Sequence, residues 1–280
     1  MRLHLIVLLF LICGCSNEES ILNPDLRLTR ITETSVFSEN ECEFITPLIY
    51  QDDQLTKIGL DSLIYNGNQL SKIIRIDSFD SVNSYCVTLG SFFDRFDSIP
   101  NRLFYSISII RSESSTTLMV DSIRWSNSVG TFVGNEIPFL RYYKNVTGQI
   151  DSLIRSQIFT IPKFQGPDKE EFFYDEEGNL KNTVHTNTTT FFGRGSETIV
   201  SETTYEYDMS SNPFSYMDEE IVIFFQFGPL SKNNPIRVEE ELITNIVYEY
   251  NSHNYPISSE IFSDTFPVYL KESFEYENIQ

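Results

Sequence analysis

The chain contains FFYDEEGNL at residues 172–180 and returns to the same form twice, as YEYDMSSNP at residues 205–213 and YEYNSHNYP at residues 248–256. Each segment has two aromatic residues separated by one position, then Asp or Asn, a short polar stretch, and Leu or Pro. Alternate residues of a β-strand lie on the same face, so both rings of a pair are expected on one face of a sheet. Asp, Asn, Gly and Ser are typical turn residues. Each segment therefore predicts a strand, a tight turn and a returning strand.

Shorter or looser copies of this unit extend over most of the chain. IYQDDQLTKI at residues 49–58 aligns with IYNGNQLSKI at residues 64–73, YYKNVTGQI occupies residues 142–150, and a final FEYEN begins at Phe274. Repeated hairpins place each strand beside the next one along the chain. The predicted fold is all-β: an antiparallel meander of repeated hairpins that forms a strongly curved sheet or an open barrel.

Composition supports this fold class. The 280 residues include 23 Phe and 15 Tyr, which favour strands, but not one Ala, the best helix former. The segment Ile221–Phe227 is apolar on both faces, and its length favours a strand covered on both sides, with a short buried helix as the alternative. A formal net charge of −20 disfavours contact with phosphate backbones, so no nucleic-acid partner is expected.

The first residues have the form of an export signal. Arg2 precedes an apolar run over residues 3–12, which is too short to span a bilayer, and the run ends in small residues. Ile12-Cys13-Gly14-Cys15 resembles a bacterial lipobox, which implies a lipoprotein signal peptide over residues 1–15. The same resemblance implies that the chain is cleaved before Cys15 and that Cys15 carries the lipid as the first residue of the mature protein. An ordinary signal peptide or a retained anchor is the alternative. Residues 16–30 are then expected to be a flexible tether and residues 31–280 a single all-β domain.

Two cysteines remain in the exported chain, Cys42 and Cys86. Exported proteins meet an oxidising compartment, so these two residues are predicted to form a disulfide. Two separately buried thiols are an equally weighted alternative, because sequence alone does not place the two Cα atoms within bridging distance. A metal site is not expected from two distant cysteines, with only His185 and His253 to complete it.

The repeats resemble degenerate YD (RHS-type) repeats, and more closely the YD-repeat lipoproteins of Bacteroidetes grouped as domains of unknown function of the DUF4595 kind. The resemblance rests on the lipobox, the hairpin units, Asn212-Pro213-Phe214 after a Tyr-Asp, and the string LSKNNP at residues 230–235. It implies a lipid-anchored protein of the outer membrane with an antiparallel fold, and it brings no catalytic residues. Ser-Asn-Glu-Glu after Cys15 also resembles signals that send such lipoproteins to the cell surface, and a plain solvated tether explains it equally well.

Motifs that carry known chemistry are not found in the sequence. No string fits a nucleophile elbow, a zinc helix, a Cys-x-x-Cys pair or a P-loop, so no catalytic residue, metal or cofactor is predicted. His185 and His253 are expected to be solvated surface imidazoles. Asp-Ser before a branched apolar residue resembles the O-glycosylation motif of exported Bacteroidetes proteins, with an ordinary strand entry as the favoured alternative. The candidate acceptors are Ser62, Ser98, Ser122 and Ser152.

Three classes of function stay open at this point. The favoured one is a lipid-anchored binding or structural module of the cell envelope, whose partner is an unknown protein or polysaccharide. The second is a hydrolase that uses carboxylates, although no pair can be singled out by spacing. The third is a carrier whose curved sheet holds an acyl chain in an apolar hollow lined by Ile and Phe.

Overall fold

The computed structural model describes residues 26–37, 40–75, 102–126, 131–156, 164–165, 168–191, 195–263 and 269–278. These form seventeen strands and one helix. Their bounds are β1 (Leu26–Phe37), β2 (Asn40–Gln51), β3 (Gln54–Ile58), β4 (Asp61–Asn66), β5 (Gln69–Arg75), β6 (Arg102–Arg111), β7 (Ser115–Ser126), β8 (Thr131–Lys144), β9 (Ile150–Arg155), β10 (Phe164–Gln165), β11 (Asp168–Tyr174), β12 (Leu180–Phe191), β13 (Gly195–Ser211), α1 (Glu219–Phe225), β14 (Asn233–Glu239), β15 (Ile243–Tyr250), β16 (Pro256–Ser263) and β17 (Tyr269–Asn278).

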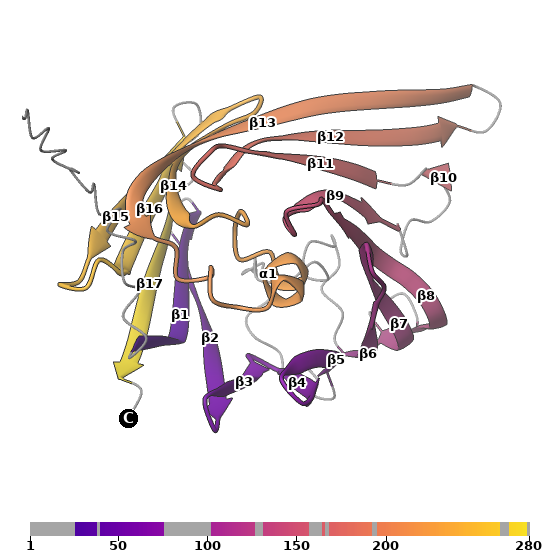
Figure 1. Ribbon diagram of the computed structural model, residues 1–280, viewed down its shortest axis with the longest axis horizontal. Helices are drawn as coiled ribbons and strands as arrows, with labels where there is room; N and C mark the ends of the chain where they lie inside the picture. Colours follow the sequence, from indigo (N-terminus) through magenta and orange to yellow (C-terminus); the bar gives the residue numbers. More distant parts are fainter. Residues whose placement is uncertain are drawn as a thin grey trace, which may run out of the picture.

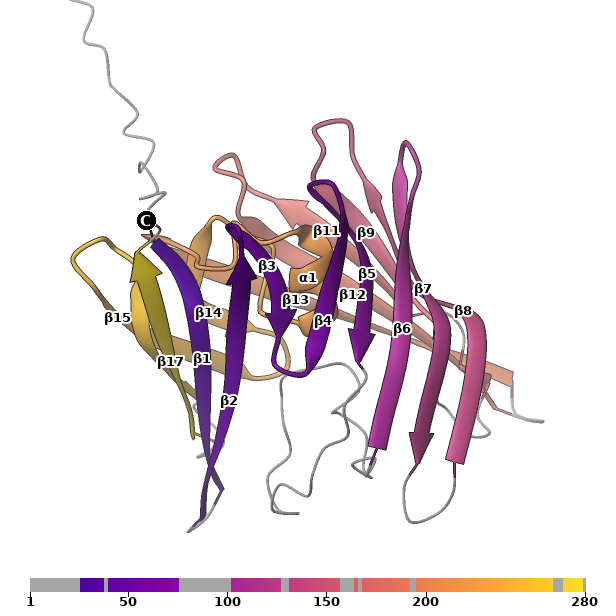
Figure 2. The ribbon, with the colours of Figure 1, turned by 90° about the horizontal axis from the view of Figure 1, so that it is seen from below.

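The strands close into a barrel. Each strand pairs antiparallel with its neighbour along the chain, except that β9 pairs with β11 and the two-residue β10 lies beside β12. The ring is completed by β1 and β17, whose register runs from Leu26 opposite Asn278 to Val36 opposite Tyr269. Figure 1 looks into this ring, and Figure 2 shows its wall from the side. The predicted antiparallel meander is confirmed, and the sheet that was expected to be strongly curved is closed.

The turn residues of the repeats form the hairpins as predicted. In the turn between β11 and β12, Oδ1 of Asp175 accepts a hydrogen bond from the backbone N–H of Asn179 at 2.8 Å, and Gly178 takes φ +90°. Asn251 binds the N–H of Tyr255 in the same way at 3.1 Å. A side-chain oxygen at this position accepts a hydrogen bond from a backbone N–H that the sharp turn leaves without a partner on the neighbouring strand.

The segment at residues 205–213 is the exception, and its predicted hairpin is wrong. The chain does not turn back after β13 but enters the barrel, forms α1, and returns to the wall at β14. Oδ1 of Asp208 accepts from the N–H of Ser210 at 2.9 Å and from the N–H of Asn234 at 3.2 Å, so it joins the points where the chain leaves and re-enters the wall. We call residues 212–232 the plug.

The prediction of a strand over Ile221–Phe227 is also wrong, because residues 219–225 are the helix α1. Figure 1 shows α1 surrounded by the wall strands. The wall strands already pair with each other on both sides, so a segment inside the ring has no sheet edge to join. A helix satisfies its backbone hydrogen bonds internally, which suits a segment that is apolar on every side. The residues of α1 from Glu220 to Phe225 are all buried.

The apolar core fills the space between the wall and the plug. Wall residues that alternate along the strands are buried, such as Leu118 and Val120 on β7, and they form one cluster with Ile221 and Phe224 of α1. The rings of Tyr105 and Phe139 contact the ring of Phe224 edge-on, with centroids 5.9 and 6.1 Å apart. The barrel is therefore a packed body in which the plug supplies the centre of the core.

The opposite face of the wall carries ion pairs between neighbouring side chains, mixed with exposed apolar residues such as Ile45 and Phe262. Several of these pairs have about half of each side chain exposed. The pairs are Arg30–Glu275, Lys72–Asp121, Lys169–Glu171, Lys271–Glu260 and Arg237–Glu239. Among the described residues, no helix combines the length and the apolar character needed to cross a membrane.

One boundary differs from the sequence-based expectation. β1 begins at Leu26, so the last part of the expected tether, up to Arg30, belongs to the barrel wall and pairs with β17.

Candidate functional site

Helix α1 is attached to the wall through its first turn. Oε1 of Glu220 accepts hydrogen bonds from the hydroxyl of Tyr142 at 2.9 Å and lies 2.8 Å from Nη2 of Arg111. Glu219 pairs with Lys144 at 2.5 Å. Because acidic groups are favoured at the start of a helix, these contacts suit the helix dipole as well as the wall cations.

The motif tyrosines hold the plug through their hydroxyl groups. Tyr65 hydrogen-bonds Asp218, and burial is the main cause that raises the pKa of Tyr65 above its ordinary value. Burial likewise raises the pKa of Tyr142, and the nearby Glu220 carboxylate adds to the effect. Both phenols therefore stay protonated and serve as hydrogen-bond donors. Burial and Glu220 also raise the pKa of Asp218 itself.

Asparagine side chains fasten the far end of the plug, where the string LSKNNP begins β14. Oδ1 of Asn179 accepts from the backbone N–H groups of Lys232 and Asn233, both at 3.1 Å. The buried amide of Asn234 donates to the carbonyl of Ser211 at 3.2 Å. A primary amide offers donors and an acceptor together, so it can pair with backbone groups that have left the sheet ladder.

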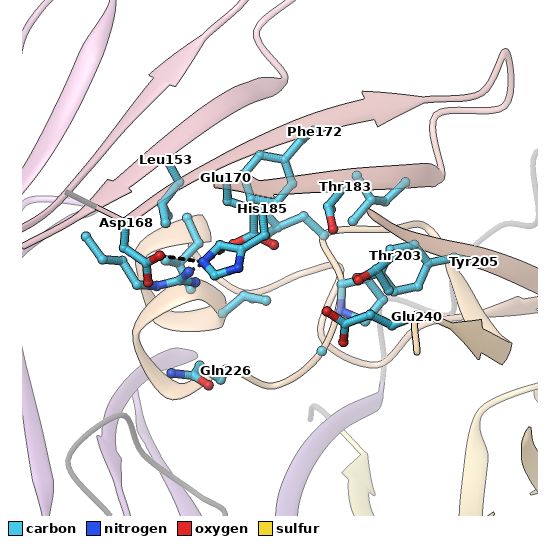
Figure 3. Close-up of a pocket in the computed structure, with 17 residues that line it drawn as sticks. Leu153, Asp168, Glu170, Phe172, Thr183, His185, Thr203, Tyr205, Gln226 and Glu240 are labelled. Atoms are coloured by element: carbon cyan, nitrogen blue, oxygen red, sulfur yellow. Dashed lines mark hydrogen bonds and ion pairs between the residues drawn. The ribbon is translucent and has the colours of Figure 1, made fainter. Parts of the chain in front are cut away.

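Between the plug and one side of the wall lies a pocket of about 620 Å³ (Figure 3). Its wall side comes from strands β9, β11, β12 and β13, and its floor comes from α1 and the loop after it. The lining residues are Leu153, Arg155, Asp168, Glu170, Phe172, Leu180, Thr183, His185, Thr203, Tyr205, Val222, Ile223, Gln226, Gly228, Pro229, Leu230 and Glu240.

One end of the pocket holds two paired carboxylates. Asp168 and Glu170 are two positions apart on β11 and share a face, and Glu170 lies opposite His185 of β12. Oδ1 of Asp168 lies 2.5 Å from Nε2 of His185, and Oε2 of Glu170 lies 2.9 Å from Nη1 of Arg155 on β9. Figure 3 shows the Asp168–His185 contact facing the pocket. All four side chains are partly exposed to it.

The other end of the pocket is built from β12, β13 and the turn after β14. Thr183 and Thr203 are directly paired across β12 and β13, and Tyr205 follows on the same face. Burial raises the pKa of Tyr205 to about 12, and a hydrogen bond from the Thr183 side chain opposes this shift. Glu240 lies at the exposed mouth. In Figure 3 this group is separated from the Asp168–His185 pair.

Apolar side chains cover the floor between the two polar ends. Val222 and Ile223 point from α1, Leu230 comes from the plug, and Phe172 and Leu180 come from the wall. A site with an apolar middle and a few polar groups at fixed places is typical of pockets for small amphipathic molecules.

The sequence did not identify this pocket. The prediction of His185 as a solvated surface imidazole is wrong, since the residue faces the lumen and contacts Asp168. His253 is exposed in its hairpin turn, as expected. The one available signal was the alternation of Asp168, Glu170 and Phe172, which is expected of any strand. Within the described residues, no group of three or more His, Cys, Asp and Glu side chains is placed so that it could hold a metal ion.

Several of the residues proposed for lipidation, disulfide formation or glycosylation lie outside the part of the chain that the structure describes. Cys15, Cys86 and Ser98 are outside the described residues, and Cys42 belongs to β2 with a side chain that is also outside them. Thus the Cys42–Cys86 disulfide stays a prediction.

Ser62, Ser122 and Ser152 belong to wall strands. Ser122 is exposed and the other two are half-buried. Asp61, which precedes Ser62, is buried and paired with Arg75. In this motif the serine is therefore accessible to solvent but the aspartate is not. The glycosylation of these serines stays a prediction.

Comparison with known proteins does not assign a family. No family model matches the chain, and no curated protein matches it. A porin-like protein from Bacteroides vulgatus ATCC 8482 is 14% identical, with a TM-score of 0.42 over 90% of this chain and 99% of that one. A porin-like protein from Bacteroides uniformis ATCC 8492 is 10% identical, with a TM-score of 0.37 over 91% and 99%. Neither score is high enough to establish a shared fold or a shared function.

Proposed function

We propose that this chain is a lipid-anchored binding module of the cell envelope, whose barrel lies in water beside the outer membrane and whose lumenal pocket takes a small amphipathic ligand. The observation that carries the ligand-binding part is the pocket itself, which lies between the wall and the plug beside the apolar core. The lipobox-like sequence that ends at Cys15 supports the anchor.

The distribution of polar groups supports a barrel outside the bilayer. A membrane barrel presents an apolar band to lipid and keeps polar groups inside. Here the lumen holds the apolar core, and the outer face carries ion pairs such as Arg30–Glu275 and Lys271–Glu260. Placing a Lys or Arg side chain on the lipid-facing surface near the middle of a bilayer would destabilise a barrel by about 2–4 kcal/mol.

The two alternatives receive less support from the pocket. For a carboxylate-dependent hydrolase, Asp168 and Glu170 each already have a side-chain partner on a neighbouring strand, so they are not a pair of carboxylates held free for the two catalytic roles. For an acyl-chain carrier, an apolar hollow lined by Ile and Phe was expected. The lining of this pocket instead mixes apolar with charged side chains, and Phe172 and Ile223 are its only Phe and Ile residues.

Fractionation of cells tests the anchor and the position of the barrel together. In one form of the chain, residues 1–15 are exchanged for a signal peptide that ordinary signal peptidase removes, so that Cys15 is absent. We expect the natural chain in the membrane pellet and the exchanged form in the aqueous envelope fraction. Recovery of the exchanged form as an integral membrane protein would show that the barrel itself lies in the bilayer.

A dye-binding experiment tests the pocket. Thr203 lines the pocket, and its neighbour Thr204 is exposed on the other face of the same strand. We expect the uncharged dye N-phenyl-naphthylamine to fluoresce with the wild-type chain and with Thr204→Trp but not with Thr203→Trp, in which the indole occupies the pocket. Equal fluorescence from the two variants, or none from the wild type, contradicts ligand binding in the lumen.

A further inference from the structure

We infer that the pocket selects amphiphiles whose polar head is a cation, namely an ammonium group on an apolar body. This inference rests on the proposed function and names the chemical class of its ligand. It follows from the charges that line the pocket, from their remaining hydrogen-bonding capacity, and from the apolar floor beside them.

The charge of the lining is negative. Asp168, Glu170 and Glu240 contribute three formal negative charges and Arg155 one positive charge, with His185 counted as neutral, so the formal sum is 1 − 3 = −2. The whole chain has the same sign, with a net charge of −20. A cationic ligand is attracted to such a site over a distance, and an anion is repelled.

The hydrogen-bonding capacity points the same way. Nη1 of Arg155, the one formal cation of the lining, is 2.9 Å from Oε2 of Glu170. An anionic head that bound Arg155 would lie beside the carboxylates of Glu170 and Asp168, which repel it. Ionised carboxylates only accept hydrogen bonds, and each has room for more than one donor. Asp168 and Glu170 therefore suit a head group that brings its own donors, and an ammonium group brings three.

The position of Asp168 and Glu170 places the head group of the ligand at one end of the pocket. The side chains of Asp168 and Glu170 are 19% and 18% exposed, so an ion pair formed with them is largely removed from solvent. Glu240 is exposed at the mouth, where water screens its charge. The apolar floor of Val222, Ile223 and Leu230 then receives the body of the ligand.

Displacement of N-phenyl-naphthylamine by three probes of equal chain length tests this inference. The probes are octylamine, octanol and octanoate, which carry a cationic, a neutral and an anionic head. We expect octylamine to displace the dye at a concentration about tenfold lower than octanol, because a hydrogen bond to a charged group is stronger than a neutral one. Octanoate should displace the dye less well than octanol.

Variants separate this inference from the proposed function. In the double variant Asp168→Asn and Glu170→Gln, octylamine should lose its advantage and displace the dye at about the concentration of octanol. The control Glu275→Gln removes a carboxylate from an exposed pair on the outer face and should leave the tenfold preference unchanged. If the dye binds but octylamine has no advantage over octanol, or octanoate is the best competitor, the inference fails and the lumenal pocket stands. If the dye does not bind the wild type, both fail.

Discussion

The hydroxyl of Tyr142 on β8 donates a hydrogen bond to Oε1 of Glu220 on α1 at 2.9 Å, and both side chains are buried. Tyr142 opens one of the repeat units, so a ring that a hairpin motif supplies to the wall also holds the helix inside the barrel. Tyr65 makes the equivalent contact with Asp218. The repeats thus build the wall and position the plug, and the plug in turn leaves the pocket.

Removing this hydroxyl should loosen the plug. Tyr142→Phe leaves one acceptor position of the buried Glu220 unpaired, so we expect the free energy of unfolding to fall by about 2 kcal/mol. Tyr143→Phe changes the next residue, on the other face of the strand, and should have little effect. Urea denaturation measures both. Equal stability of the two variants would show that the Tyr142 contact contributes nothing to holding α1.

The buried pair between Asp61 and Arg75 should be costly to break. Nε of Arg75 lies 3.0 Å from Oδ1 of Asp61, the Tyr105 hydroxyl donates to the same oxygen, and the exposed fraction of Asp61 is 1%. Asp61→Asn leaves the guanidinium buried without its counter-charge, and we expect a loss of about 3 kcal/mol. Glu275→Gln, at an exposed pair, should cost under about 1 kcal/mol. A loss at Asp61 no larger than at Glu275 contradicts this prediction, and thermal or urea unfolding decides.

The pKa of Asp218 makes the stability of the plug depend on pH. Burial, with the charge of Glu220, raises this pKa, so the folded chain binds the proton more tightly than the unfolded chain. The contribution of Asp218 to stability is therefore present below the ordinary aspartate pKa and is lost as the pH rises through the raised value. Asp218→Asn cannot ionise and should be more stable than the wild type at neutral pH.

Urea midpoints measured across the acid range test this expectation. The advantage of Asp218→Asn should shrink as the pH falls and should vanish where Asp218 is protonated in both the folded and the unfolded chain. A constant difference at every pH would mean that the effect of the substitution comes from packing rather than from the charge.

The glycine in the turn between β11 and β12 should resist substitution. Gly178 has φ +90°, and a Cβ added there would lie 3.3 Å from Cε of Lys232. Gly178→Ala should lower the free energy of unfolding by about 1 kcal/mol or more, because L-residues are strained at this φ and Lys232 must also move. Gly148, with φ +86° and an open Cβ position, provides the control for backbone strain alone. A smaller loss at Gly178 than at Gly148 would contradict the contact with Lys232.

The predictable part of the fold is the part encoded locally. The paired aromatics and the Asp or Asn that follows them specify a face of a strand and a turn, and Asp175 and Asn251 bind backbone N–H groups as their turns require. The unit at residues 205–213 has the same residue pattern but does not form a hairpin. There Oδ1 of Asp208 accepts hydrogen bonds from the backbone N–H groups of Ser210 and Asn234, which lie on the two sides of the plug. Nothing near Asp208 in the sequence distinguishes the two outcomes.

By itself the sequence determined the class of fold, the order of the strands and the sharing of one sheet face by the two rings of a motif, since these depend on neighbours within a few residues. Only the tertiary structure decided that β1 and β17 close the ring, that residues 219–225 form a helix, and that Asp168, Glu170 and His185 face a pocket. These outcomes depend on contacts between residues far apart in the chain, such as Glu220 with Arg111 and Tyr142, and local patterning carries no information about such partners.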